Sequence, residues 1–128
     1  MASIFMRKKV KRVTINPNKR RIVVVEPNKL PEERIIGENL EDFQKVVGGN
    51  IEITRDEKLP GMIIVVNEEG KIRGLPWNRR IKNGGAIDYI SGTFFVIGDS
   101  GSDFVNLSDK QVSQVMHRFS LPKKRSSL

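Results

Sequence analysis

The apolar residues of this chain come in short runs, and the length of those runs constrains the fold more than any other feature. The two longest runs are Ile22–Val25 and Met62–Val66. Runs of this size suit β-strands, which are usually about 3–10 residues long, whereas a membrane-spanning helix needs about 20 apolar residues. Glu26 and Pro27 follow the first run and Asn67 follows the second, so each run is also bounded. The two runs therefore predict buried strands of a compact sheet.

Shorter patterns predict the rest of the sheet. Apolar and polar residues alternate over 50–55, as they do in a half-buried strand, and Phe94 and Phe95 lie within a predicted strand at 93–97. A short strand is expected at 34–36. The segment Asn67–Gly70 is expected to form a reverse turn that leads into 71–73, giving a hairpin.

Two segments repeat their apolar residues at helical spacing, which predicts helices at about 38–47 and 108–119. Gly48 follows the first segment and can adopt the left-handed conformation that ends a helix. Ser108 and Gln111 stand at the spacing of a capping box before the second segment. About five strands and two helices that do not alternate regularly predict an α+β domain with a mainly antiparallel sheet.

The charges divide the chain into a body and two basic ends. The chain has 128 residues and a net charge of +8, yet residues 1–21 contain eight lysines and arginines and no acid. Residues 122–128 add three more cations, whereas acids slightly outnumber cations between these segments. We therefore expect a basic N-terminal arm (1–20), one folded domain (21–121) and a basic tail (122–128).

Two features indicate a cytoplasmic protein. The chain has no cysteine, which excludes disulfides and thiolate chemistry and is typical of a reducing compartment. Near the N-terminus the cations Arg7, Lys8 and Lys9 follow the apolar residues, whereas a signal peptide begins with its charges.

One basic segment, Gly70–Lys82, is expected to form a loop and predicts a ligand site; we call it the basic loop. It contains five cations, no acid and Trp77, the only tryptophan. Guanidinium groups beside an aromatic face suit a phosphate attached to a flat ring, as in a nucleotide. The predicted ligand-binding residues are Lys71, Arg73, Trp77, Asn78, Arg79, Arg80, Thr93 and Phe94. In the alternative interpretation, Trp77 covers the core and the arginines pair with Glu68, Glu69 or Asp88.

The sequence predicts no catalytic residue, metal site or cofactor, and we expect a protein that is not an enzyme. Glu68 and Glu69 are adjacent, so on a strand their carboxylates would point to opposite faces. His117 is the single histidine, and no Gly-x-Ser-x-Gly segment offers an activated serine for it.

Four pieces of sequence, in order, resemble the bacterial and phage family called domain of unknown function 3846. They are Leu40–Gly49 with Ile51-Glu52, Asn67–Lys71 with Leu75–Arg80, Gly92–Gly98, and Leu107–Asp109. The resemblance extends over roughly residues 22–111. It implies a small protein of phages or mobile elements, acting in the host cytoplasm if a phage encodes it, and brings no catalytic residue.

The leading hypothesis is a non-catalytic binding protein that holds a phosphate-bearing, nucleotide-like ligand. A phage protein of this kind could sequester a host nucleotide signal used in immunity. We also expect a homodimer or higher homo-oligomer, because small chains often complete a site across a symmetric interface.

Two alternatives remain open. The first is an accessory protein that binds nucleic acid with the basic loop and with the cations of the arm. Those cations are Arg7, Lys8, Lys9, Lys11, Arg12, Lys19 and Arg20. The second is an inhibitor that binds a host enzyme through a protein–protein interface.

Overall fold

A computed structural model of the chain describes residues 17–120, and its centre is an antiparallel sheet with the order β2-β1-β7-β4-β3. A short strand, β8, pairs with β7, and β5 and β6 form a separate hairpin. The elements are β1 (Lys19–Val25), β2 (Glu32–Gly37), α1 (Leu40–Val47), β3 (Ile51–Thr54), β4 (Met62–Asn67), β5 (Trp77–Asn83), β6 (Ala86–Ser91), β7 (Phe94–Asp99), β8 (Phe104–Val105) and α2 (Asp109–Arg118). The predicted α+β class with a mainly antiparallel sheet is confirmed.

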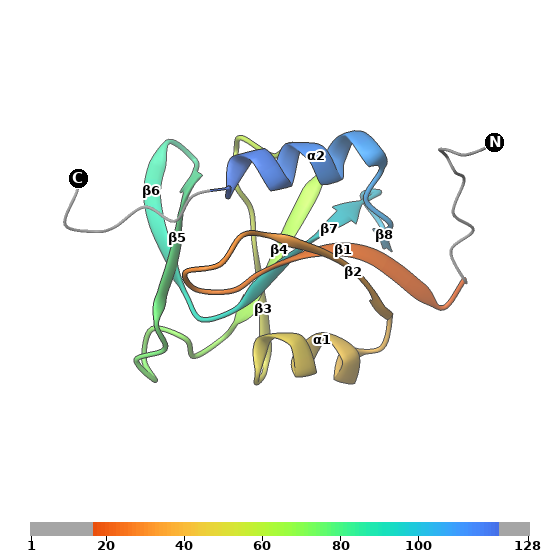
Figure 1. Ribbon diagram of the computed structural model, residues 1–128. Helices are drawn as coiled ribbons and strands as arrows, with labels where there is room; N and C mark the ends of the chain where they lie inside the picture. The colour runs from red at the N-terminus through yellow and green to blue at the C-terminus, as the bar shows by residue number, and fades with distance from the viewer. Residues whose placement is uncertain (1–16, 121–128) are drawn as a thin grey trace.

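The sheet is buried on both faces because a helix lies against each of them (Figure 1). Phe43 and Val47 of α1 pack with Phe95 in the core on one face. Val115 of α2 packs with Phe94 on the opposite face. The continuous apolar runs that form β1 and β4 are explained by this arrangement, since both sides of these strands need apolar residues.

Both helices have the end signals that their sequences predicted. The backbone of Gly48 is left-handed, with φ of 81°, and its N–H donates to Gln44 O. At the start of α2, Gln111 N donates to Ser108 Oγ, and Ser108 N donates to Gln111 Oε1, which completes the capping box. Helix α1 begins at Leu40, two residues later than predicted, because Asn39 is its N-cap.

The structure corrects two predictions about the segment between β4 and β7. Residues 71–73 lie in a series of turns and not in a strand. The segment expected to be a basic loop is largely strand β5, which pairs with β6 and turns at Gly84 and Gly85, with φ of 60° and 84°. Two consecutive residues with positive φ are typical of a type I′ hairpin turn. The strand was missed because two of its inward residues are polar and a bulge between Trp77 and Arg79 breaks the alternation.

Three further features bear on the site. Strand β3 is an edge strand of the described sheet, since its one partner among residues 17–120 is β4. The β5–β6 hairpin lies at one end of the domain, beside the sheet and α2 (Figure 1). Strand β1 begins at Lys19, slightly before the predicted domain start at residue 21, and most of the predicted arm and tail lies outside the described residues.

Candidate ligand-binding site

The β5–β6 hairpin has two faces with different chemistry. Its register places Arg79 opposite Ile90 and Ile81 opposite Asp88, and these residues face the body of the protein. The register also pairs Arg80 with Tyr89, on the outer face. The cations of the basic segment are therefore divided between two faces and do not form one cluster.

Asn78 and Arg79 are internal residues, with 0% and 1% of their surface exposed. Asn78 Nδ2 donates to Val25 O and Gly92 O, and Asn78 Oδ1 accepts from Arg79 Nη1 at 2.7 Å. Asn78 thereby joins the bulge in β5 to the end of β1. Its side-chain groups are engaged by the protein itself, which leaves none of them for a ligand.

The guanidinium of Arg79 is buried without a carboxylate beside it in the described structure. Nε and Nη2 donate to Phe119 O at 3.2 and 3.0 Å, Nη2 also donates to Lys29 O, and Nη1 donates to Asn78 O and Oδ1. Desolvation by burial lowers the pKa of Arg79 from its ordinary value. Since Phe119 is the C-cap of α2, this cation lies at the negative end of that helix. Arg79 holds the hairpin, α2 and the 27–31 turn together.

The aromatic residues of β7 also belong to the core. Phe94 and Phe95 are both fully buried, and they point to opposite faces of the sheet. Phe94 meets the ring of Phe119 edge to face, with centroids 5.3 Å apart. Neither phenylalanine lines a ligand pocket, contrary to the expectation for one of them. Thr93 is half-buried in the connection between β6 and β7.

Lys71 and Arg73 lie in the turns that precede the hairpin. Lys71 Nζ forms an ion pair with Asp88 Oδ1 at 2.7 Å. The alternative interpretation paired Asp88 with an arginine, whereas the structure pairs it with this lysine. This hydrogen bond lowers the pKa of Asp88 below its ordinary value. Arg73 is exposed and its guanidinium lies near Gly49, just beyond α1. Within residues 17–120, neither cation forms a hydrogen bond or ion pair with Arg80 or Trp77.

Three side chains remain as a candidate site on the outer face of the hairpin. Trp77 and Tyr89 have ring centroids 6.4 Å apart, and Arg80 lies opposite Tyr89 in the register. Arg80 is half-buried and makes no ion pair with any carboxylate in the described part of the chain. The buried Nε1 of Trp77 has no acceptor among residues 17–120. A buried donor without a partner is unusual, because the lost hydrogen bond costs about 1–3 kcal/mol.

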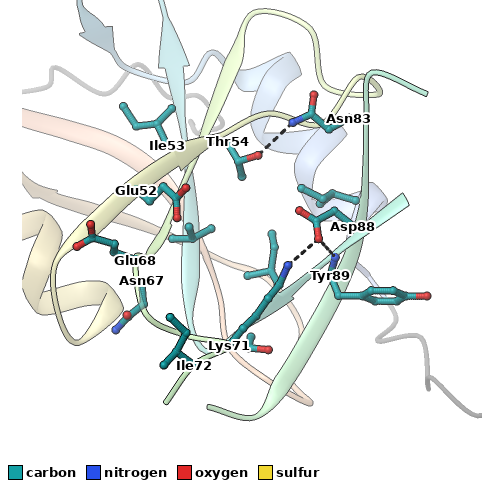
Figure 2. A pocket seen from close by; sticks show the side chains of 15 residues that line it. Glu52, Ile53, Thr54, Asn67, Glu68, Lys71, Ile72, Asn83, Asp88 and Tyr89 are labelled. Carbon is teal, nitrogen blue, oxygen red and sulfur yellow. Dashed lines mark hydrogen bonds and ion pairs between the residues drawn. The ribbon is translucent and has the colours of Figure 1, made fainter. Parts of the chain in front are cut away.

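A cleft of about 510 Å³ opens on the other side of the hairpin, between it and strands β3 and β4. Val66, Ile81 and Ile90 supply apolar walls. The polar lining includes Glu52, Thr54, Asn83, Lys71 and Asp88. Figure 2 shows Lys71 and Asp88 joined across the cleft and Asn83 directed to Thr54, whereas the ring of Tyr89 points away.

This cleft was not predicted from the sequence. It needs the hairpin to fold back beside β3, and no local pattern reveals that arrangement. Only Lys71 of the eight predicted ligand-binding residues lines the cleft. Because its carboxylates outnumber its lysine, the cleft is a poor match for the predicted anion.

The cations of the nucleic-acid alternative are placed only in part. Arg20 forms an ion pair with Glu38 at 3.1 Å and Lys19 is exposed, whereas Arg7, Lys8, Lys9, Lys11 and Arg12 lie outside the described residues. Over residues 17–120, no group of three or more histidine, cysteine and acidic side chains could hold a metal ion. No helix in that range is long and apolar enough to cross a membrane.

Comparison with known proteins identifies a family but no activity. The sequence model of the family described as "Domain of unknown function (DUF3846)" matches residues 19–120, so the chain belongs to this family. The resemblance inferred from residues 22–111 is thereby confirmed and extended at both ends. No curated protein matches the chain, and no solved structure matches it either.

Proposed function

We propose that this protein is a non-catalytic binding protein that holds a phosphate-bearing, nucleotide-like ligand on the outer face of the β5–β6 hairpin. The observation that carries the proposal is the position of Arg80. It is half-buried beside two aromatic residues and has no carboxylate partner in the described part of the chain. A guanidinium in this setting is available for a bidentate contact with a phosphate.

Each of the three side chains has a separate role in the proposal. Arg80 binds the phosphate, and the ring of Tyr89 or Trp77 stacks on the base, a contact worth about 1–3 kcal/mol per base. No hydrogen bond from the described part of the chain holds the indole of Trp77 in place, so a small rotation toward a ligand breaks none there. Its Nε1 would then gain the acceptor that it lacks.

The residues of the proposed site differ from those predicted from the sequence. It retains Trp77 and Arg80, adds Tyr89, and omits Asn78, Arg79 and Phe94 because these are buried in contact with the protein itself. The protein binds its ligand and breaks no bond in it. In a cell infected by a phage that encodes such a protein, this binding would lower the free concentration of a host nucleotide signal.

The first test is to identify the ligand. The purified protein is denatured, and released small molecules are analysed by mass spectrometry. We expect a phosphorylated compound with a base, recovered in smaller amount from Arg80→Gln. Arg73→Gln is the matched control, because Arg73 is an exposed cation of the same segment that lies near α1.

Two results would contradict this assignment. Equal recovery from Arg80→Gln and wild type would remove Arg80 from the site. Recovery that falls in Arg73→Gln but not in Arg80→Gln would move the site to the turns before the hairpin. If no compound is co-purified, the same variants are titrated with nucleoside monophosphates and cyclic dinucleotides, and the absence of binding by wild type would overturn the proposal.

A further inference from the structure

The edge of β3 has backbone groups that the sheet does not use. Glu68 N donates to Asn50 O at 2.8 Å, which makes 50 and 68 a hydrogen-bonded pair at the end of the β3–β4 ladder. Hydrogen-bonded and non-hydrogen-bonded pairs alternate in an antiparallel ladder. The N–H and C=O of Ile51 and Ile53 therefore point away from β4, to the free edge. Within residues 17–120, no backbone hydrogen bond from outside the sheet reaches them.

The cleft beside the hairpin opens onto this edge. Glu52, Ile53 and Thr54 are consecutive and all line the cleft, although neighbouring side chains of a strand point to opposite faces. The backbone of β3 must therefore form part of the cleft wall. Just beyond Thr54, Glu57 N donates to Lys82 O at 2.7 Å, so β5 closes the edge at that end.

The charges of the cleft favour a basic side chain. In the described structure Glu52 is exposed and forms no ion pair, whereas Asp88 forms a single ion pair, with Lys71. Asp88 has its pKa lowered, chiefly by the hydrogen bond from Lys71, and is therefore ionised at neutral pH. The three side chains together have a net charge of −1. Val66, Ile81 and Ile90 form the apolar walls of the cleft, and these walls suit the aliphatic part of a lysine or arginine.

We propose that the β3 edge and this cleft bind an extended peptide with basic residues at alternate positions. The peptide adds an antiparallel or parallel strand to β3 through the outward groups of Ile51 and Ile53. One of its basic side chains enters the cleft and meets Glu52 and Asp88. This site is separate from the outer face of the hairpin, and the proposal does not depend on the nucleotide-like ligand.

The test uses the full chain and synthetic peptides with blocked ends, measured by fluorescence anisotropy at low salt. The first probe is a seven-residue peptide that alternates lysine with valine. Its controls are a peptide that alternates glutamate with valine, and the lysine peptide N-methylated at alternate backbone amides. We expect the lysine peptide to bind at least about tenfold more tightly than either control, because the glutamate peptide repels Glu52 and the methylated one cannot complete the ladder.

Two protein variants locate the binding. Glu52→Gln should weaken binding of the lysine peptide roughly two- to fivefold, as expected for an exposed charge pair, whereas Glu41→Gln on α1 should not. Ile53→Pro removes one outward N–H and should weaken binding of the lysine peptide further. We expect this variant to fold, because proline is tolerated at an edge position whose N–H faces solvent. Circular dichroism checks that this variant is folded; if it is not, the N-methylated peptide tests the same hydrogen bonds.

The proposal fails if the glutamate peptide binds as tightly as the lysine peptide, or if N-methylation leaves the affinity unchanged. It also fails if Glu52→Gln and Glu41→Gln have equal effects, because the attraction would then be general and not local to the cleft. Arg80→Gln should leave peptide binding unchanged, which separates this result from that of the nucleotide proposal.

Discussion

Replacing Arg79 should destabilise the protein strongly, and the size of the effect follows from its hydrogen bonds. Arg79→Met retains an unbranched side chain but removes the guanidinium. The carbonyls of Phe119 and Lys29 and the side-chain oxygen of Asn78 each lose a charged donor. At about 1–3 kcal/mol for each buried acceptor left without a partner, the gross cost is roughly 3–9 kcal/mol.

In the native protein the buried guanidinium of Arg79 also has an unfavourable desolvation free energy of several kcal/mol. Arg79→Met removes this unfavourable contribution, which offsets part of the cost. We therefore expect a net loss of about 2–4 kcal/mol in the free energy of unfolding. The melting temperature of a domain of this size should fall by roughly 8–16 °C. Urea unfolding followed by far-ultraviolet circular dichroism measures the loss directly.

Arg80→Met is the matched control, since the neighbouring arginine lies on the outer face of the same strand and makes no ion pair in the described part of the chain. Its effect should stay within about 0.5 kcal/mol of wild type. If Arg79→Met were as stable as Arg80→Met, the role of Arg79 in joining the hairpin to α2 would be refuted.

Three more predictions concern stability. Arg118→Met leaves the buried carboxylate of Asp56 without its 2.7 Å ion pair and should cost about 1–3 kcal/mol in urea unfolding; a change below about 0.5 kcal/mol would contradict this. Gly92→Ala combines a φ of 86° with a Cβ placed 2.8 Å from the side chain of Leu75. It should cost about 1 kcal/mol more than Gly101→Ala, whose φ is also positive but whose Cβ meets no atom of the described residues within 4 Å. Equal melting temperatures of the two variants would rule out the close contact. The pKa of Asp88 is lowered in the folded state, so its stabilising effect is present above the ordinary value near 4 and is lost as the pH falls through the lowered pKa. When the pH falls from 6 to 3, Asp88→Asn should therefore lose less stability than wild type. The difference should be at most about 1 kcal/mol, because the Lys71–Asp88 pair is exposed. An equal loss of stability in both proteins would contradict the assignment.

Much of the fold could be predicted because the responsible signals are local. The apolar runs of β1 and β4 and the capping box at Ser108 specify their elements within a few residues. Strand β5 could not be recognised, since Asn78 and Arg79 face inward and are satisfied by carbonyls that come from distant parts of the chain. Burial of such residues depends on tertiary contacts that hydrophobic alternation does not reveal.

The candidate site was predicted only in part for the same reason. The composition of Gly70–Lys82 indicated a segment rich in arginine around the single tryptophan, but not which arginine would be buried. Adjacent residues of a strand point to opposite sides, so Arg79 and Arg80 receive opposite environments once the segment is a strand. The cleft beside β3 depends on how the hairpin folds back, which leaves no signal in any short stretch of sequence.

The fluorescence of Trp77 tests most directly whether Trp77 and Arg80 form the proposed ligand site on the hairpin. Trp77 is the only tryptophan, so its emission reports on this site alone. Titration with the compound released from the purified protein, or with nucleoside monophosphates and cyclic dinucleotides, should quench the emission in a saturable manner. Quenching should require at least about tenfold more ligand in Arg80→Gln, as expected when a charged hydrogen-bond pair is lost. Binding shown by calorimetry with unchanged Trp77 emission, or the same affinity in Arg80→Gln, would contradict the claim.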